Sequence, residues 1–184
     1  MKKNPSLIGF LVTLAIMAFC YLFYTLFLEK EDRYLITNPS EKQIQIQIDN
    51  QNYTIAPKQI TDIKLKPGKH SLKFTLKGKQ TDTTFHITRA NAIINPTRSE
   101  YFVFTRPYGA ARNKDSIFTS QTITIDNKVY YGNTKRYTDL YIQNFYYNLD
   151  QEYPKFFLNK GQDTDITKIF SKEDFIQFYF ENYE

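Results

Sequence analysis

The feature that most constrains this chain is an uninterrupted apolar stretch near its N-terminus. From Leu7 to Leu28 the sequence reads LIGFLVTLAIMAFCYLFYTLFL and contains no charged residue. A helix of this length would be about 33 Å long, close to the roughly 30 Å hydrocarbon core of a bilayer. In lipid every backbone polar group must be paired within the protein, so a lone apolar segment crosses as a helix. We therefore predict a transmembrane helix at residues 7–28, preceded by a cytoplasmic N-terminus at residues 1–6.

The residues that flank this stretch bear on its orientation. Lys2 and Lys3 precede it, and Glu29 to Arg33 follow it with two further basic residues. Because both sides carry two basic side chains, charge alone hardly decides the orientation in the membrane. A short basic region before the first apolar run is, however, what the export machinery recognises. We therefore predict a single-pass protein of the cell membrane, with its N-terminus inside and its C-terminal domain extracytoplasmic.

Two other interpretations of the stretch are less favoured. A cleaved signal peptide has a shorter apolar core and ends at small residues, whereas this run is longer and offers no Ala-x-Ala site. Cys20 follows Phe19, which is larger than the residues expected before a lipidated cysteine. A buried thiol in an anchor helix is the simpler interpretation of Cys20.

Composition limits what the rest of the chain can be. Of the 184 residues 41% are apolar, and 15 Tyr and 16 Phe supply enough large side chains for a packed core. The only cysteine lies in the apolar stretch, so the aqueous part has no disulfide and no thiolate metal site. Residues 29–116 are net basic and residues 117–184 net acidic, which hints at two sub-regions.

Short alternating runs after the apolar stretch predict a mostly β domain. In Gln43 to Ile48 the pattern places three isoleucines on one face and three glutamines on the other. Several such runs, each bounded by turn residues, predict an antiparallel β-sandwich over residues 34–105. Glu100 to Thr105 is apolar on both faces and is expected to be a central, covered strand. Asn38-Pro39-Ser40 and Asn95-Pro96-Thr97 suggest a repeated turn, though two matches do not make a repeat architecture.

Residues 43–88 combine several turn features. The Asp49 turn follows an alternating strand, Pro57 precedes the next strand, and Lys66-Pro67-Gly68-Lys69 precedes a strand closed by Gly78. In these features the segment resembles the PEGA-type domain, a small β-sandwich of envelope and surface proteins. The Pro-Glu-Gly-Ala signature is absent. The resemblance implies a non-catalytic binding or spacer module and carries over no functional residue.

The last part, residues 116–184, is expected to form an aromatic-rich β/α region after a loop at Arg106 to Asp115. Asp126-Asn127-Lys128 is typical of a hairpin turn. Tyr137 to Phe157 could be a strand with an ordered loop, or a helix. A short C-terminal helix is expected after Ser171, whose hydroxyl can cap the first N–H groups. Its core-facing residues are expected to be Phe175, Phe178 and Tyr179.

Recognisable catalytic and metal-binding motifs are absent from the sequence. It contains no P-loop, GxSxG, HExxH, CxxC or Rossmann glycine pattern. His70 and His86 are interpreted as structural or surface histidines rather than metal ligands, and Asp163-Thr164-Asp165 as a turn leading into a helix rather than a carboxylate pair. We predict no catalytic residue, no cofactor and no metal, and hence a protein that is not an enzyme.

One electrostatic feature suggests a ligand. Lysines at alternate positions of the runs around residues 60–66 and 70–77 would project from the solvent face of one hairpin. These lysines are Lys64, Lys66, Lys73 and Lys77. They could hold anionic lipid headgroups or an acidic envelope polymer, or simply form a solvated face that blunts edge pairing. Nucleic acid is not expected, because exposed aromatic residues for stacking are missing among the lysines.

Together these features favour an anchored protein whose exported β-rich module binds or braces an envelope polymer or protein. Two alternatives remain open. The chain could be a subunit of a membrane complex held through Gly9, Thr13 and Tyr21 of its anchor, or an enzyme with an unrecognised site in the C-terminal region.

Overall fold

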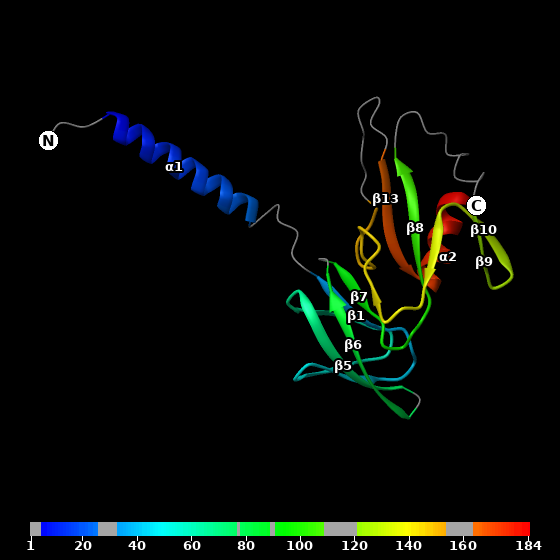
Figure 1. The fold of residues 1–184 in the computed structure, drawn as a ribbon. Coiled ribbons are helices and arrows are strands. Elements are labelled where there is room, and N and C mark those ends of the chain that lie inside the picture. Colours follow the sequence, from blue (N-terminus) through cyan, green and yellow to red (C-terminus); the bar gives the residue numbers. More distant parts are fainter. Residues whose placement is uncertain (1–4, 26–32, 77, 89–90, 109–120, 154–163) are drawn as a thin grey trace. The chain divides into compact units, whose positions relative to one another are not determined.

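A computed structural model describes residues 5–25, 33–76, 78–88, 91–108, 121–153 and 164–184 (Figure 1). The chain divides into two compact units, Met1–Asp32 and Arg33–Glu184. The first contains helix α1, Pro5–Phe23, and the second contains all the strands and a second helix.

Helix α1 covers most of the apolar stretch that the sequence marks out. Its large side chains are exposed, from Phe10 at 63% to Phe23 at 47%. Among the described residues, no helix is both long and apolar enough to cross a membrane. The transmembrane part of the expected fold is therefore not supported by the structure.

The second unit is mostly β, with antiparallel sheets and a short C-terminal helix, as the sequence predicts. Sheet A has the order β12 (Tyr141–Ile142), β7 (Ala92–Ile94), β1 (Tyr34–Asn38), β4 (Gln59–Ile63). Sheet B has the order β3 (Gln51–Ile55), β2 (Ile44–Ile48), β5 (Gly68–Leu76), β6 (Lys79–Ile87). Sheet C has the order β11 (Thr134–Tyr137), β8 (Tyr101–Tyr108), β13 (Thr164–Ser171). Sheet D is the hairpin of β9 (Thr122–Ile125) and β10 (Lys128–Tyr131), and helix α2 is Lys172–Tyr183. Strands β1 and β7 pair in parallel within sheet A.

Three apolar cores separate these elements into layers. On β1, Tyr34 and Ile36 belong to the core shared with sheet B, whereas Leu35 belongs to the core shared with sheet C. Successive side chains of a strand point to opposite faces, so sheet A must lie between sheets B and C. Figure 1 shows this order, with β1 and β7 between β5 and β8.

Strand β8 repeats the arrangement one layer further on. Tyr101 and Val103 face the core shared with sheet A, while Phe102 and Phe104 face a third core with α2 and sheet D. All four side chains are at most 3% exposed. The expectation of a central, covered strand at residues 100–105 is thus confirmed. The strand also continues to Tyr108, beyond the start of the expected loop.

The repeated Asn-Pro motif forms the same turn twice. The amide of buried Asn38 donates to the carbonyl of Lys42 at 2.8 Å, and its oxygen accepts from the Ser40 hydroxyl at 2.6 Å. Asn95 likewise donates to the carbonyl four residues on, and its oxygen accepts from the hydroxyl two residues on. These turns end β1 and β7, the two parallel neighbours of sheet A.

Several expectations for the C-terminal region are confirmed. Asp126 and Asn127 have φ of 48° and 65°, the conformation of a tight hairpin turn between β9 and β10. The Ser171 hydroxyl caps α2 by accepting from the amide of Asp174 at 3.2 Å. The expected apolar stripe of α2 packs on the third core through Phe175, Phe178 and Tyr179.

Other expectations need correction or stay open. Thr164 and Asp165 begin strand β13, paired with the end of β8, and do not lead into a helix. Within the described residues from 137 to 153 the chain contains the last residue of β11, strand β12 and loops, but no helix. The division into residues 34–105 and 116–184 stays a prediction, and β12 of the second range pairs with β7 of the first.

Candidate functional site

The structure separates the lysines that the sequence places on one hairpin. Strand β4 pairs with β1 in sheet A, whereas β5 pairs with β2 and β6 in sheet B. The expected hairpin is therefore wrong, because the chain crosses between two sheets where it passes through Lys64 and Lys66, both exposed. Lys73 lies on β5, and Lys77 lies outside the described residues. The proposed anionic-ligand role of these lysines stays a prediction.

A groove of about 440 Å³ lies on the outer face of sheet B. We call it the sheet B groove. Alternation explains its chemistry: Ile46 and Phe74 point into the first core, and the residues beside them on each strand point out. The outward polar side chains that line it are Gln45, Gln47, Asn52, Thr54, Thr75 and Gln80, with Lys73 among them.

Strand register arranges these side chains in two rows across the sheet. In the first row Gln47 stands opposite both Asn52 on β3 and Lys73 on β5, and Lys73 stands opposite Asp82 on β6. The second row contains the pairs Gln45–Thr54 and Thr75–Gln80. Directly opposed side chains have Cβ atoms about 5 Å apart, so the first row is continuous across all four strands. The second row consists of one pair on β2 and β3 and one pair on β5 and β6.

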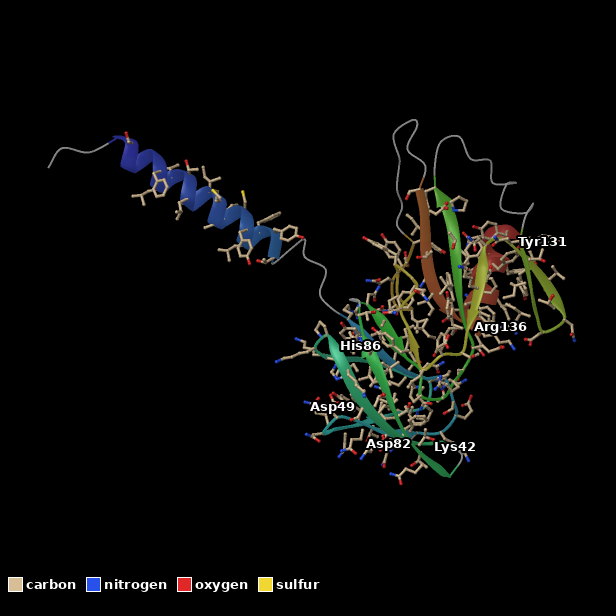
Figure 2. The ribbon with its side chains drawn as sticks, viewed as in Figure 1. Lys42, Asp49, Asp82, His86, Tyr131 and Arg136 are labelled. Atoms are coloured by element: carbon tan, nitrogen blue, oxygen red, sulfur yellow. The ribbon has the colours of Figure 1, made fainter. Side chains whose placement is uncertain are left out.

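Among the described residues, the charge at the groove is balanced. The Lys73 ammonium lies 3.7 Å from the carboxylate of Asp82, and both side chains are about half exposed. Figure 2 labels Asp82 on this sheet. The other polar groups are carboxamides and hydroxyls, which donate and accept hydrogen bonds without carrying charge. The groove is thus a hydrogen-bonding surface more than an electrostatic one.

A histidine–aspartate pair fixes one end of sheet B. The Nδ1 atom of His70 lies 2.7 Å from the Asp49 carboxylate, which also accepts from the Ser71 amide at 2.9 Å. Burial opposes protonation of His70, but the hydrogen bond with Asp49 and that with the Lys66 carbonyl raise its pKa overall. The hydrogen bond from His70, then that from the Ser71 amide, lowers the pKa of Asp49. These contacts tie the β2–β3 turn to β5, which agrees with the structural interpretation of His70.

The part of the chain that the structure describes holds no cluster of three His, Cys, Asp or Glu residues that could bind a metal. His86 is exposed on β6 and stands opposite Lys69 on β5. Asp49, the partner of His70, belongs to the β2–β3 turn. The two histidines therefore lie in different surroundings, and nothing in their geometry indicates a shared ligand.

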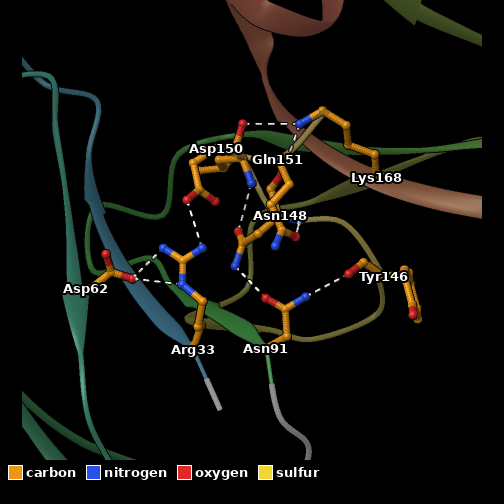
Figure 3. Close-up of polar contacts among 9 residues, drawn as sticks. Arg33, Asp62, Asn91, Tyr146, Asn148, Asp150, Gln151 and Lys168 are labelled. Carbon is orange, nitrogen blue, oxygen red and sulfur yellow. Dashed lines mark hydrogen bonds and ion pairs between the residues drawn. The ribbon is translucent and has the colours of Figure 1, made fainter. Parts of the chain in front are cut away.

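A polar cluster that the sequence does not reveal joins sheets A and C (Figure 3). Arg33, just before β1, forms ion pairs with Asp62 at 2.8 Å and with Asp150 at 2.9 Å. Nearby, buried Asn148 donates through its side-chain amide to Asn91 at 2.7 Å. The cluster fixes the loop after β12 against β4 and β7.

Lys168 on β13 is the most perturbed group of this cluster. Its side chain is only 7% exposed, and its Nζ donates to the carbonyls of Asn148 at 2.9 Å and Leu149 at 3.1 Å. The Nζ also lies 4.6 Å from the centre of the Phe170 ring. Burial lowers the pKa of Lys168 to about 8, although nearby carboxylates partly oppose this change.

The apolar neighbours Ile169 and Phe170 are the sequence signal that could have indicated the burial of Lys168. Its contacts are structural, since the ammonium group caps the carbonyls of a loop.

A second concavity of about 240 Å³ lies between the ends of β1 and β4 and the start of α2. The hydroxyls of Thr37 and Tyr101 are 2.5 Å apart at its wall, and burial raises the pKa of Tyr101 to about 12. Asp174 also lines it, but this carboxylate accepts from the Ser171 hydroxyl at 2.6 Å as part of the helix cap. The concavity therefore offers a weaker case for a ligand site than the sheet B groove.

No protein-family model matches the sequence, and the comparisons found no similar curated protein or solved structure. The resemblance of residues 43–88 to the PEGA-type domain consequently stays a prediction. The case for a functional site rests on the geometry of the sheet B groove.

Proposed function

We propose that this chain is a single-pass membrane-anchored protein whose exported β-rich unit binds a polymer of the cell envelope through the sheet B groove. One observation carries the proposal. The polar side chains on the outer face of sheet B form a continuous concave surface across β3, β2, β5 and β6. Ligand-binding sites are commonly concave and largely preformed, with polar groups that converge on the ligand.

The apolar stretch at residues 7–28 supports the anchor. It has no charge to solvate, and the side chains that α1 exposes include Phe10, Met17 and Phe19 at 63–69%. A helix that is apolar all round is stable only when its surroundings are apolar as well. Lipid supplies such surroundings, and the basic N-terminus supports an orientation with the β-rich unit outside.

The side chains of the groove support binding rather than catalysis. Chemistry at neutral pH needs a nucleophile, or an acid and a base with tuned pKa values, facing the same space. Gln45, Gln47, Asn52 and Gln80 offer neither, and Lys73 forms an ion pair with Asp82. The most perturbed lysine, Lys168, is occupied by loop carbonyls.

The proposal is tested with the full chain carrying a C-terminal tag. The tagged protein should resist alkaline extraction, and protease should remove the tag from the outer side of intact cells. Its detergent-solubilised form should then co-sediment with envelope material from which protein has been stripped. Replacement of Gln47 and Gln80 by Ala should weaken co-sedimentation, while Gln177→Ala, at an exposed position of α2, should not.

The outcomes separate the proposal from its alternatives. A tag that is protected outside would contradict the orientation. Unchanged co-sedimentation of the Gln47→Ala/Gln80→Ala variant would contradict the assignment of the groove. Cross-links from Gly9 or Tyr21 to another protein inside the bilayer, together with loss of polymer binding, would favour a subunit of a membrane complex.

A further inference from the structure

The glutamine side chains of the sheet B groove differ from the other amide side chains in the described part of this unit. Elsewhere in this unit, amide side chains such as those of Asn38 and Asn148 are buried and hydrogen-bonded to backbone or to each other. By contrast, within the described part of the chain no hydrogen bond engages the side chains of Gln45, Gln47 or Gln80. They therefore remain available to a ligand.

The charge balance in the groove argues against a polyanion. Among the described residues, the one charged side chain that lines it is Lys73. Its ammonium lies 3.7 Å from the carboxylate of Asp82, which stands opposite it on β6. A polyanion would have to displace this carboxylate or accept its repulsion at close range. An uncharged ligand meets no such penalty.

The hydrogen-bonding groups match a hydroxyl-rich ligand. Each carboxamide offers one oxygen acceptor and two N–H donors, and each threonine hydroxyl both donates and accepts. Sugar hydroxyls have the same double character, so every contact can be satisfied whichever way the hydroxyl proton points. Two threonines, Thr54 and Thr75, add such hydroxyls between the amides.

The spacing of the two rows fits an extended chain of sugar rings. Neighbouring strands lie about 4.8 Å apart, so a row across four strands is roughly 14 Å long. Side chains two residues apart on one strand are separated by roughly 7 Å, which leaves room for a ring between the rows. Gln47 and Lys73 lie in one row, and Gln45 and Thr75 in the other.

From these observations we infer that the sheet B groove binds an uncharged, extended glycan strand that runs across β3, β2, β5 and β6. The two rows of amides and hydroxyls bond the ring hydroxyls from both sides. The inference rests on the proposed function and names the ligand class of its groove. It replaces the acidic polymer that the lysine pattern suggested with a neutral one.

The test uses the full chain in phosphatidylcholine nanodiscs, since sugar-based detergents would compete with the ligand. The probes are chitohexaose and cellohexaose as neutral glycans and polygalacturonate as a polyanion, each titrated by calorimetry. We expect a neutral hexaose to bind with an affinity that hardly changes with salt. Gln47→Ala and Gln80→Ala should each weaken it about three- to tenfold, the effect of one lost hydrogen bond. Gln177→Ala should leave it unchanged.

The Lys73→Gln variant separates the two ligand classes. A neutral glycan should retain its affinity within about twofold, because glutamine still donates and accepts hydrogen bonds. Tighter binding of polygalacturonate than of either hexaose, abolished by Lys73→Gln or by salt, would overturn the inference in favour of an acidic polymer. Failure of both hexaoses to bind would overturn it as well. If neither hexaose bound but the protein still co-sedimented with envelope material, the proposed function would stand and the neutral glycan would be excluded as its ligand.

Discussion

The buried ammonium of Lys168 makes the stability of this protein depend on pH in a direction that can be calculated. Its pKa is lowered from 10.5 to about 8 in the folded state. In the window between these values the unfolded chain binds the proton more tightly, so the folded state gains stability as pH rises. A tenfold difference in proton affinity between the two states corresponds to about 1.4 kcal/mol, and from about pH 7 to about pH 9.5 the gain is on the order of 1–2 kcal/mol.

Replacing Lys168 by Met removes the titrating group and keeps the length of the side chain. It also leaves the carbonyls of Asn148 and Leu149 without their donor, so the variant should be less stable at every pH in this window. The difference in unfolding free energy between wild type and Lys168→Met should widen by about 1–2 kcal/mol from about pH 7 to about pH 9.5. Tyrosines with raised pKa values act equally in both proteins and cancel in this difference.

The assay is urea denaturation followed by near-UV circular dichroism, which reports the buried tyrosines in a chain without Trp. Lys64→Met, at an exposed position, serves as the control for loss of one positive charge. A difference that stays constant or narrows with pH would refute the reasoning, because it would mean that burial does not lower the pKa of Lys168.

Three further predictions concern stability. His70 has a raised pKa, so its pairing with Asp49 stabilises the fold below about pH 6.5 and loses effect as pH rises through the folded-state pKa. Asp49 has a lowered pKa, so this stabilisation also declines as the pH falls below 3.8, the ordinary pKa of the carboxyl group. Urea denaturation of His70→Asn should therefore show the largest loss of stability, relative to wild type, between about pH 4 and about pH 6.5. Asn38→Ala removes the donor to the carbonyls of Lys42, Ile55 and Ala56 and should cost about 2–4 kcal/mol by urea denaturation, whereas an unchanged midpoint would contradict the role of the turn. Phe175→Ala empties a fully buried position between Phe102 and Tyr130 and should lower stability by about 3–5 kcal/mol, while Phe180→Ala, at an exposed position of the same helix, should change it little.

Local features of the fold could be predicted because their causes are local. Strand β2 follows from strict alternation, the β9–β10 hairpin from Asp126 and Asn127, and helix α2 from the Ser171 cap and its apolar stripe. Pairing between sheets could not be predicted in this way. Periodicity shows that Ile63 and Leu72 face inward, but it does not show that their strands belong to different sheets.

Part of the candidate site could be predicted as well, because alternation along a strand is a local property. The alternation in β2 already places Gln45 and Gln47 on a polar face, and the structure has them there. Their partners Asn52 and Gln80 come from strands whose pairing the sequence leaves open. The lysines drew attention because charge is conspicuous in a sequence. Of the three that the structure describes, only Lys73 lines the groove, and only the structure shows that it pairs with Asp82.

The order of the layers explains why the groove lies where it does. Sheet A is covered on one face by sheet B and on the other by sheet C, and sheet C is covered in turn by α2 and sheet D. A sheet packed on both faces must use apolar residues at successive positions, as Tyr34-Leu35-Ile36 and Tyr101-Phe102-Val103-Phe104 do. Among the described residues of this unit, sheet B packs on a core through one face. Its strands can therefore alternate apolar and polar residues, and its free face can carry binding groups without loss of core packing.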